Sequence, residues 1–283
     1  MSIRRSAGRA TSALFISSSL ALSGCVTQAP GAGAPPPPGP VGQVRTKAPP
    51  PRQRFEAVDP TTSTAEQFAK DVLSSTAEAV ASYVPAKPAR PQDGVDPVTG
   101  LDLTLRLVST APLAYGTPFT SIHVPSVAGL GPRPDMAAPG AMDPGGAYEV
   151  WKSAEKTWSQ QYDAAAAAAQ AGSKTVAAVD LSFKEWSGIT GVMSALAAVA
   201  PADGDVSFAI ASDLVETVPP QTTGDFHGKP LLVIQPNPSG DAAAADAAFA
   251  SFASWATGRG IGQIARVRPE VADAALRTWL GVK

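Results

Sequence analysis

The chain has 283 residues and a formal net charge of −2, with 24 acidic and 22 basic side chains. It contains no basic patch interleaved with aromatic residues, so a nucleic-acid partner is not expected. Its single cysteine, Cys25, cannot form an internal disulfide, so the fold must depend on a hydrophobic core.

The first 24 residues have the pattern of an export signal. Three arginines within residues 4–9 precede an uncharged stretch, 10–22, which is too short for a stable membrane span. The stretch ends in Leu22-Ser23-Gly24-Cys25, which resembles the bacterial lipobox. This resemblance implies cleavage before Cys25 and lipidation of its thiol. The alternative is an ordinary secretory signal that happens to be followed by a cysteine.

Lipid on Cys25 would attach the chain to a membrane of the cell envelope, because several acyl chains on one residue anchor firmly. Val26 stands where an aspartate would resemble an inner-membrane retention signal. In a Gram-negative organism we therefore expect the periplasmic face of the outer membrane. Residues 25–52 are rich in Pro, Gly and Ala, which predicts an extended tether without a core. Residues 53–283 are long enough for one domain.

Strand and helix patterns alternate through this domain. In chain order they predict a strand at 55–58, a helix at 64–83, strands at 101–108 and 119–124, a helix at 148–181 with a kink at Gly172, a helix at 189–199, strands at 206–211 and 230–235, a helix at 241–257, a strand at 264–267 and a helix at 269–280. The alternation predicts an α/β fold, a Rossmann-like three-layer sandwich with helices on both faces. The sheet should be mostly parallel, with one antiparallel edge strand from the hairpin 101–124.

Oxygen-bearing side chains follow the first strand, in the segment Asp59-Pro60-Thr61-Thr62-Ser63. Alternate positions put Asp59, Thr61 and Ser63 on one side of the loop. Mg²⁺ prefers such hard oxygen ligands. The segment resembles the metal-ion-dependent adhesion site of the von Willebrand factor type A family, which uses Asp-x-Ser/Thr-x-Ser at this point.

The resemblance implies two further ligands, a threonine before a later helix and an aspartate after the fourth strand. The segment 187–196 matches the threonine loop and its helix. Thr190 is preferred because it keeps the spacing to the following Ala195-Leu196, and Ser187 is the alternative hydroxyl. Asp213 matches the final aspartate. Tracing the predicted elements up and down the sheet brings all three parts to the same edge.

Two features depart from the family pattern, which otherwise covers residues 54–280. Pro60 lies inside the motif, and the first strand carries charges where the family has an apolar central strand. Serine, threonine and aspartate also favour helix N-caps, so Asp59 and its neighbours could serve as caps alone.

These patterns favour a membrane-anchored protein-binding module of the cell envelope. Its Mg²⁺ would complete its coordination with an acidic group from an unknown envelope protein. The alternative is a structural or assembly lipoprotein with the same fold and a degenerate, metal-free site.

An enzyme is not expected, because no nucleophile–base pair, Gly-x-Ser-x-Gly elbow or Walker loop is present. The two histidines, His123 and His227, fall on the predicted edge strand and in a turn. The five tryptophans lie on or beside predicted helices, which favours core packing over sugar binding.

Overall fold

The computed structural model describes residues 49–60, 66–90, 98–108, 120–135, 146–181, 188–236 and 241–282. The predicted signal, Cys25 and the tether as far as residue 48 lie outside these residues. The elements are β1 (Arg52–Val58), α1 (Glu66–Ala81), β2 (Leu101–Leu107), β3 (Thr120–Val124), the 3-10 helix η2 (Ala128–Leu130), α2 (Ala147–Ala177), α3 (Ile189–Val199), β4 (Val206–Ala211), β5 (Pro230–Ile234), α4 (Ala242–Gly258), β6 (Gln263–Val267), the 3-10 helix η4 (Pro269–Val271) and α5 (Ala272–Leu280).

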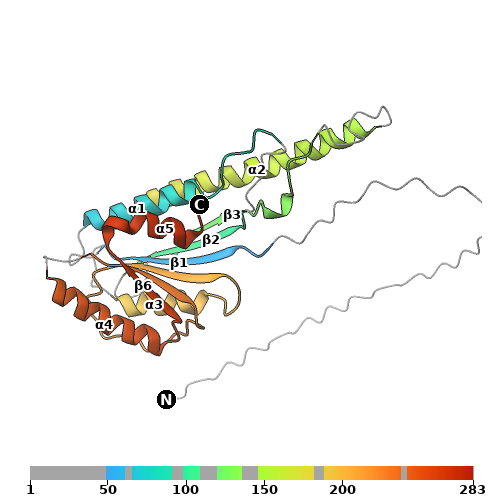
Figure 1. The fold of residues 1–283 in the computed structure, drawn as a ribbon. Coiled ribbons are helices and arrows are strands. Elements are labelled where there is room, and N and C mark those ends of the chain that lie inside the picture. The colour runs from blue at the N-terminus through green and yellow to red at the C-terminus, as the bar shows by residue number, and fades with distance from the viewer. Residues whose placement is uncertain are drawn as a thin grey trace, which may run out of the picture. The chain divides into compact units, whose positions relative to one another are not determined.

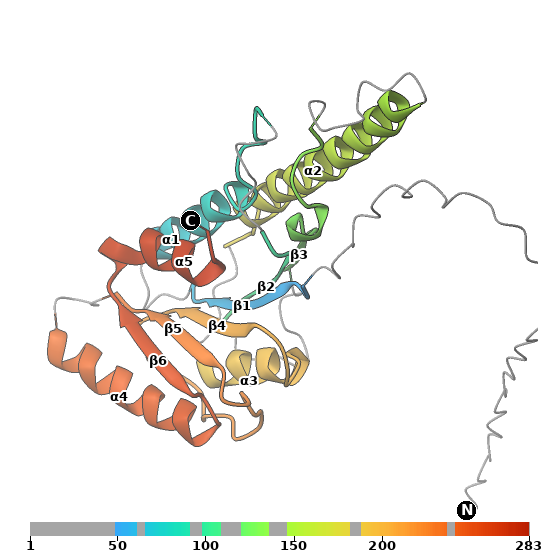
Figure 2. The same cartoon turned by 45° about the vertical axis from the view of Figure 1, so that its right-hand side comes forward.

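The strands form one six-stranded sheet in the order β3-β2-β1-β4-β5-β6. All neighbouring pairs are parallel except β2 with β3, which is antiparallel at one edge. Helices α1, α2 and α5 cover one face and α3 and α4 the other (Figures 1 and 2). The predicted α/β, Rossmann-like three-layer sandwich is confirmed. Among the described residues, no helix is long and apolar enough to cross a membrane.

The alternation in β2 has the expected structural origin. Its four leucines at 101, 103, 105 and 107 are buried on the face covered by α1, α2 and α5. Every residue of β4 is buried, because α3 covers the second face of that strand. Burying a leucine or valine side chain stabilises a fold by roughly 1.5–3 kcal/mol, so these strands carry much of the core.

The central strand β1 begins at Arg52, so the prediction of a short strand from Phe55 was wrong at its start. The buried Arg54 side chain donates from Nε to the carbonyl oxygen of Trp279 at 2.7 Å and from Nη1 to Asp205 Oδ1 at 2.8 Å. Arg52 donates to the carbonyl oxygen of Gly281 at 3.1 Å. The charges that made this strand look unsuited to the sheet centre therefore hold the C-terminal helix and the turn before β4.

Helix α2 ends at Ala177, earlier than the predicted Leu181, and remains helical through Gly172. A Cβ at Gly172 would lie 2.4 Å from Ile122 Cγ2 on β3, well inside van der Waals contact. The glycine therefore serves the close approach of α2 to β3 rather than a break in the helix. The predicted final helix is divided, with η4 over the first turn from Pro269 and α5 after it.

One buried carboxyl group lies within the central strand. Glu56 is 1 % exposed and accepts a hydrogen bond at 2.9 Å from Thr76 Oγ1 on α1. Burial raises the pKa of Glu56 to about 7, and the bond from Thr76 offsets part of that rise. Below about pH 7 the folded domain therefore favours the protonated form of Glu56.

This carboxyl should make stability fall as the pH rises. Between the ordinary pKa of 4.5 and about 7, the folded state holds a proton that the unfolded state has released. At about 1.4 kcal/mol per pKa unit, the loss across this window is about 3 kcal/mol. Glu56→Gln keeps an acceptor for Thr76 but cannot ionise, so its urea unfolding should lack this fall and show higher stability above pH 7. The exposed Glu78→Gln is the matched control. An unchanged pH profile in Glu56→Gln would contradict this assignment.

Candidate functional site

Asp59 lies at the carboxyl edge of the sheet, directly after β1, and its side chain is fully buried. Its backbone N–H donates to the carbonyl oxygen of Ala211, the last residue of β4, at 2.9 Å, which continues the β1–β4 ladder past the end of β1. Ser212 Oγ donates to Asp59 Oδ2 at 2.7 Å and accepts from the N–H of Leu214 at 2.9 Å. The ends of the two central strands are thus joined through a carboxylate.

Asp213 follows at the end of β4 and is 1 % exposed. Its Oδ1 accepts from the N–H of Val215 at 2.9 Å, a local turn that aspartate favours. Its backbone carbonyl accepts from Gln235 Nε2 at 3.0 Å, and the same nitrogen donates to the carbonyl of Ala245 at 3.0 Å. Gln235 therefore ties the ends of β4 and β5 to helix α4.

Thr190 lies in the first turn of α3 and is also buried. Its Oγ1 donates to Glu216 Oε1 at 3.1 Å, and its N–H donates to Glu216 Oε2 at 3.0 Å. The N–H of Gln221 donates to Thr190 Oγ1 at 2.9 Å. A threonine hydroxyl has one donor and two acceptor sites, so these bonds use the donor and one acceptor.

Glu216 is the acidic residue that the sequence analysis missed. It lies in the loop after β4, and its carboxylate meets backbone donors at the start of α3, where the helix dipole favours negative charge. Burial raises the pKa of Glu216, the bonds from Thr190 lower it, and the charge of Asp59 raises it further. Asp59 and Glu216 are therefore close enough to repel each other.

The structure places three of the predicted ligands at element ends near one edge of the sheet: Asp59 and Asp213 follow β1 and β4, and Thr190 lies in the first turn of α3. Thr61, Ser63 and the alternative Ser187 lie outside the described residues. Within the described ranges, no group of three or more His, Cys, Asp or Glu residues could hold a metal ion. The donors gathered at this edge are carboxylate and hydroxyl oxygens, which is the chemistry that Mg²⁺ prefers.

The remaining candidate side chains lie elsewhere. His123 is exposed on the edge strand β3, where its Nδ1 lies 2.6 Å from Oδ1 of the cross-strand Asp102, and His227 occupies a turn beside Asp225. Trp158 is buried, and Trp255 and Trp279 pack against the core, as expected. Trp151 is half-buried at the start of α2, and Trp186 lies outside the described residues.

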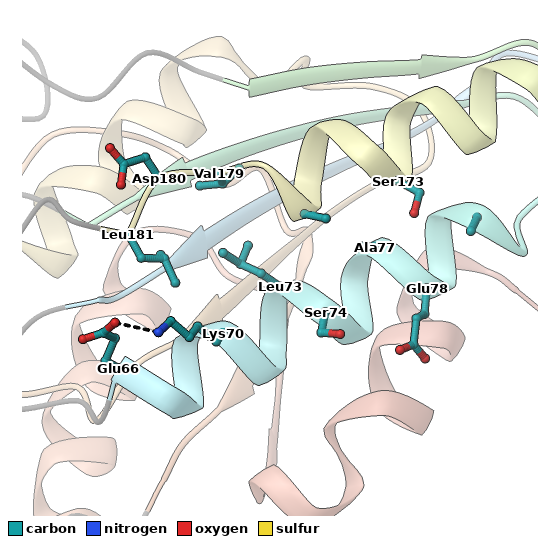
Figure 3. A pocket seen from close by; sticks show the side chains of 12 residues that line it. Glu66, Lys70, Leu73, Ser74, Ala77, Glu78, Ser173, Val179, Asp180 and Leu181 are labelled. Carbon is teal, nitrogen blue, oxygen red and sulfur yellow. Dashed lines mark ion pairs between the residues drawn. The ribbon is translucent and has the colours of Figure 1, made fainter.

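A groove of about 770 Å³ lies between α1 and the C-terminal end of α2 (Figure 3). Leu73, Ala77 and Leu181 line it, and a Glu66–Lys70 ion pair of 2.7 Å lies at one end. None of the predicted ligands is among the described residues that line this groove. The oxygen cluster at the sheet edge is therefore the better candidate site.

Comparison with protein-family models, with curated proteins and with solved structures finds no match to this chain.

The hydroxyl of Ser212 should be needed for the cluster to hold together. Ser212→Ala removes the hydroxyl that donates to Asp59 and accepts from the N–H of Leu214, and both of these hydrogen bonds are buried. Losing a buried partner of this kind costs about 1–3 kcal/mol, which chemical denaturation can measure. Ser207→Ala, at a buried serine within β4, is the matched control. Equal and small losses in both variants would contradict a special role for Ser212.

Proposed function

We propose that this chain is a membrane-anchored lipoprotein of the cell envelope that binds a partner protein through a Mg²⁺ ion at the carboxyl edge of its sheet. The ion would be held by Asp59, Thr61, Ser63, Thr190 and Asp213, with Ser187 as the alternative to Thr190. An acidic group of the partner would complete the coordination. The proposed role is binding rather than catalysis.

The burial of Asp59 and Asp213 next to Ser212 is the observation that carries this proposal. Asp59 and Asp213 have almost no solvent exposure, and the negative charge of Asp59 acts on Glu216. Keeping like charges away from water is costly, although both carboxylates accept hydrogen bonds, from Ser212 and from the N–H of Val215. A divalent cation would offset the repulsion, and the unused acceptor site of the Thr190 hydroxyl could serve as a ligand.

The alternative of a metal-free structural or assembly lipoprotein is favoured by the hydrogen bonds of Thr190. Glu216 already binds both donors of Thr190, the N–H and the hydroxyl, and Gln221 binds the same hydroxyl. A polar cluster closed by its own hydrogen bonds could stabilise the end of the sheet without a cation. The two functions differ in their response to divalent metal.

Metal addition should stabilise the full mature chain in detergent. At a Mg²⁺ concentration about 100 times the dissociation constant, a single site raises the free energy of unfolding by about 2.7 kcal/mol. Thermal unfolding with Mg²⁺, with Mn²⁺ and with chelator measures this effect. Asp59→Asn should abolish the metal response. Asp163→Asn on the exposed side of α2 removes the same charge far from the site and should leave the response intact.

The opposite outcomes separate the alternatives. A wild-type protein whose unfolding is indifferent to both metals favours the metal-free structural role. A metal response that survives in Asp59→Asn places any bound cation elsewhere and overturns the proposed site.

The anchor has its own test. The mass of the mature amino terminus should show cleavage before residue 25 and acyl chains on Cys25, and the protein should enter the detergent-rich phase on phase separation. Cys25→Ser removes the only thiol, so it should lose the lipid and the partitioning, because acyl chains supply the membrane affinity. A wild-type amino terminus without added lipid mass contradicts the anchor without bearing on the metal site.

A further inference from the structure

Helix α2 is far longer than the sheet face needs. Its 31 residues span about 46 Å at about 1.5 Å per residue, whereas the neighbouring α1 has 16 residues. The C-terminal half of α2 packs on α1 and β3, and the N-terminal half projects beyond the sheet as an arm (Figures 1 and 2). The arm therefore needs a function or a support outside the core.

Loops brace the middle of this arm. Tyr162 donates its hydroxyl proton to the carbonyl oxygen of Pro85 at 2.7 Å, and Trp158 Nε1 donates to the carbonyl oxygen of Gly131 at 3.2 Å. An ion pair of 2.7 Å joins Arg133 to Glu155. These contacts hold the arm in a fixed direction relative to the sheet, so the side chains at its N-terminal end have a fixed position.

Two large apolar side chains in the first turn of the arm are exposed. Tyr148 is 44 % and Val150 71 % exposed, and Trp151 is half-buried with its ring centroid 5.8 Å from that of Tyr148. Trp151 Nε1 donates to the carbonyl oxygen of Pro134 at 3.3 Å, so this ring lies partly against the domain. A single exposed apolar side chain is ordinary, but two exposed ones beside a half-buried tryptophan, at the end of a braced helix, make a small apolar patch. We name these three residues the α2 tip.

The charges around the α2 tip are of both signs and nearly balance. Glu149 and Glu155 carry negative charge, Lys152 and Lys156 carry positive charge, and Arg133 pairs with Glu155. The ammonium of Lys152 lies 5.9 Å from the ring centroid of Tyr148. Aromatic rings with nearby lysines are typical of segments that lie at the membrane–water interface, where one end of each side chain is apolar and the other polar. The balance favours apolar insertion over attraction to charged lipid.

The direction of the arm agrees with a membrane partner. In both views the N-terminal end of α2 and the start of β1 lie toward the same end of the strands, away from the end at which β1 stops (Figures 1 and 2). Asp59 directly follows the last residue of β1. The chain enters β1 at Arg52, and only the residues between it and Cys25 separate the domain from the proposed lipid. Fully extended, that segment reaches at most about 95 Å, which sets an upper limit on the distance between the domain and the proposed lipid.

We propose that the α2 tip, Tyr148, Val150 and Trp151, rests in the lipid–water interface of the membrane to which the chain is tethered. This inference depends on the lipid anchor of the proposed function, because a nearby bilayer lets a small apolar patch bind at high effective concentration. The contact orients the domain with the Asp59 edge turned toward its partner.

Fluorescence quenching tests this contact in the full mature chain on phosphatidylcholine vesicles. Acylated Cys25 cannot react with a thiol probe, so Val150→Cys introduces one unique labelling site. The matched control is Ala243→Cys, an exposed position on α4. With nitroxide-labelled lipid as the quencher, we expect quenching at residue 150 to exceed that at residue 243 at least two-fold.

A second variant keeps the test independent of folding defects. Tyr148→Ser with Trp151→Ser in the Val150→Cys background should reduce quenching to the level of the control while far-ultraviolet circular dichroism stays unchanged. Equal quenching at residues 150 and 243 overturns the contact. Emission at residue 150 that changes with protein concentration but ignores the lipid quencher also overturns it and indicates a second copy as the occupant. Mass spectrometry of Cys25 reads the anchor separately.

Discussion

The position of β1 in the centre of the sheet is the constraint on which the rest of the domain depends. It pairs with β2 on one side and β4 on the other, and both ladders are parallel. Its polar side chains reach three different elements, with Arg54 bound to the last turn of the chain and to Asp205, and Glu56 bound to Thr76 on α1. Burying these polar side chains is costly, and the hydrogen bonds to their partners offset part of that cost.

The same strand determines where the oxygen cluster lies. The ladder between β1 and β4 extends through the N–H of Asp59 to the carbonyl of Ala211. Since parallel strands end at one edge, this register puts Asp59 beside Ser212 and Asp213. The Thr190–Glu216 contact then brings the start of α3 to the same place. A proposed metal site and a proposed lipid contact at opposite ends of the strands would give the tethered domain a defined orientation.

Regular patterns in the sequence predicted much of the fold and failed where tertiary contacts decide. Helix α3 and strand β4 occur at the predicted bounds because their apolar runs have clear ends. The start of β1 could not be read from its sequence, since Arg52 and Arg54 look exposed until Asp205 and the C-terminal carbonyls are placed beside them. Gly172 suggested a kink, and that prediction failed because the contact with Ile122, on a strand distant in sequence, cannot be read from the local pattern.

Regular patterns also explain which residues of the candidate site could be predicted from the sequence. Asp59 and Asp213 follow strands and Thr190 lies at the start of a helix, so their positions at the edge could be anticipated. Glu216 and Ser212 lie in or next to an irregular loop whose path no periodicity describes. The acidic residue soon after a strand end was a usable signal, because a carboxylate there can reach the amino terminus of a neighbouring helix.

Diffraction from crystals of the mature chain grown with Mn²⁺ tests the central claim most directly. We expect a single anomalous peak within bonding distance of the Asp59 and Thr190 oxygens. Crystals in which Thr190 is bound only by Glu216, with no anomalous signal beside Asp59, would contradict a metal-dependent site.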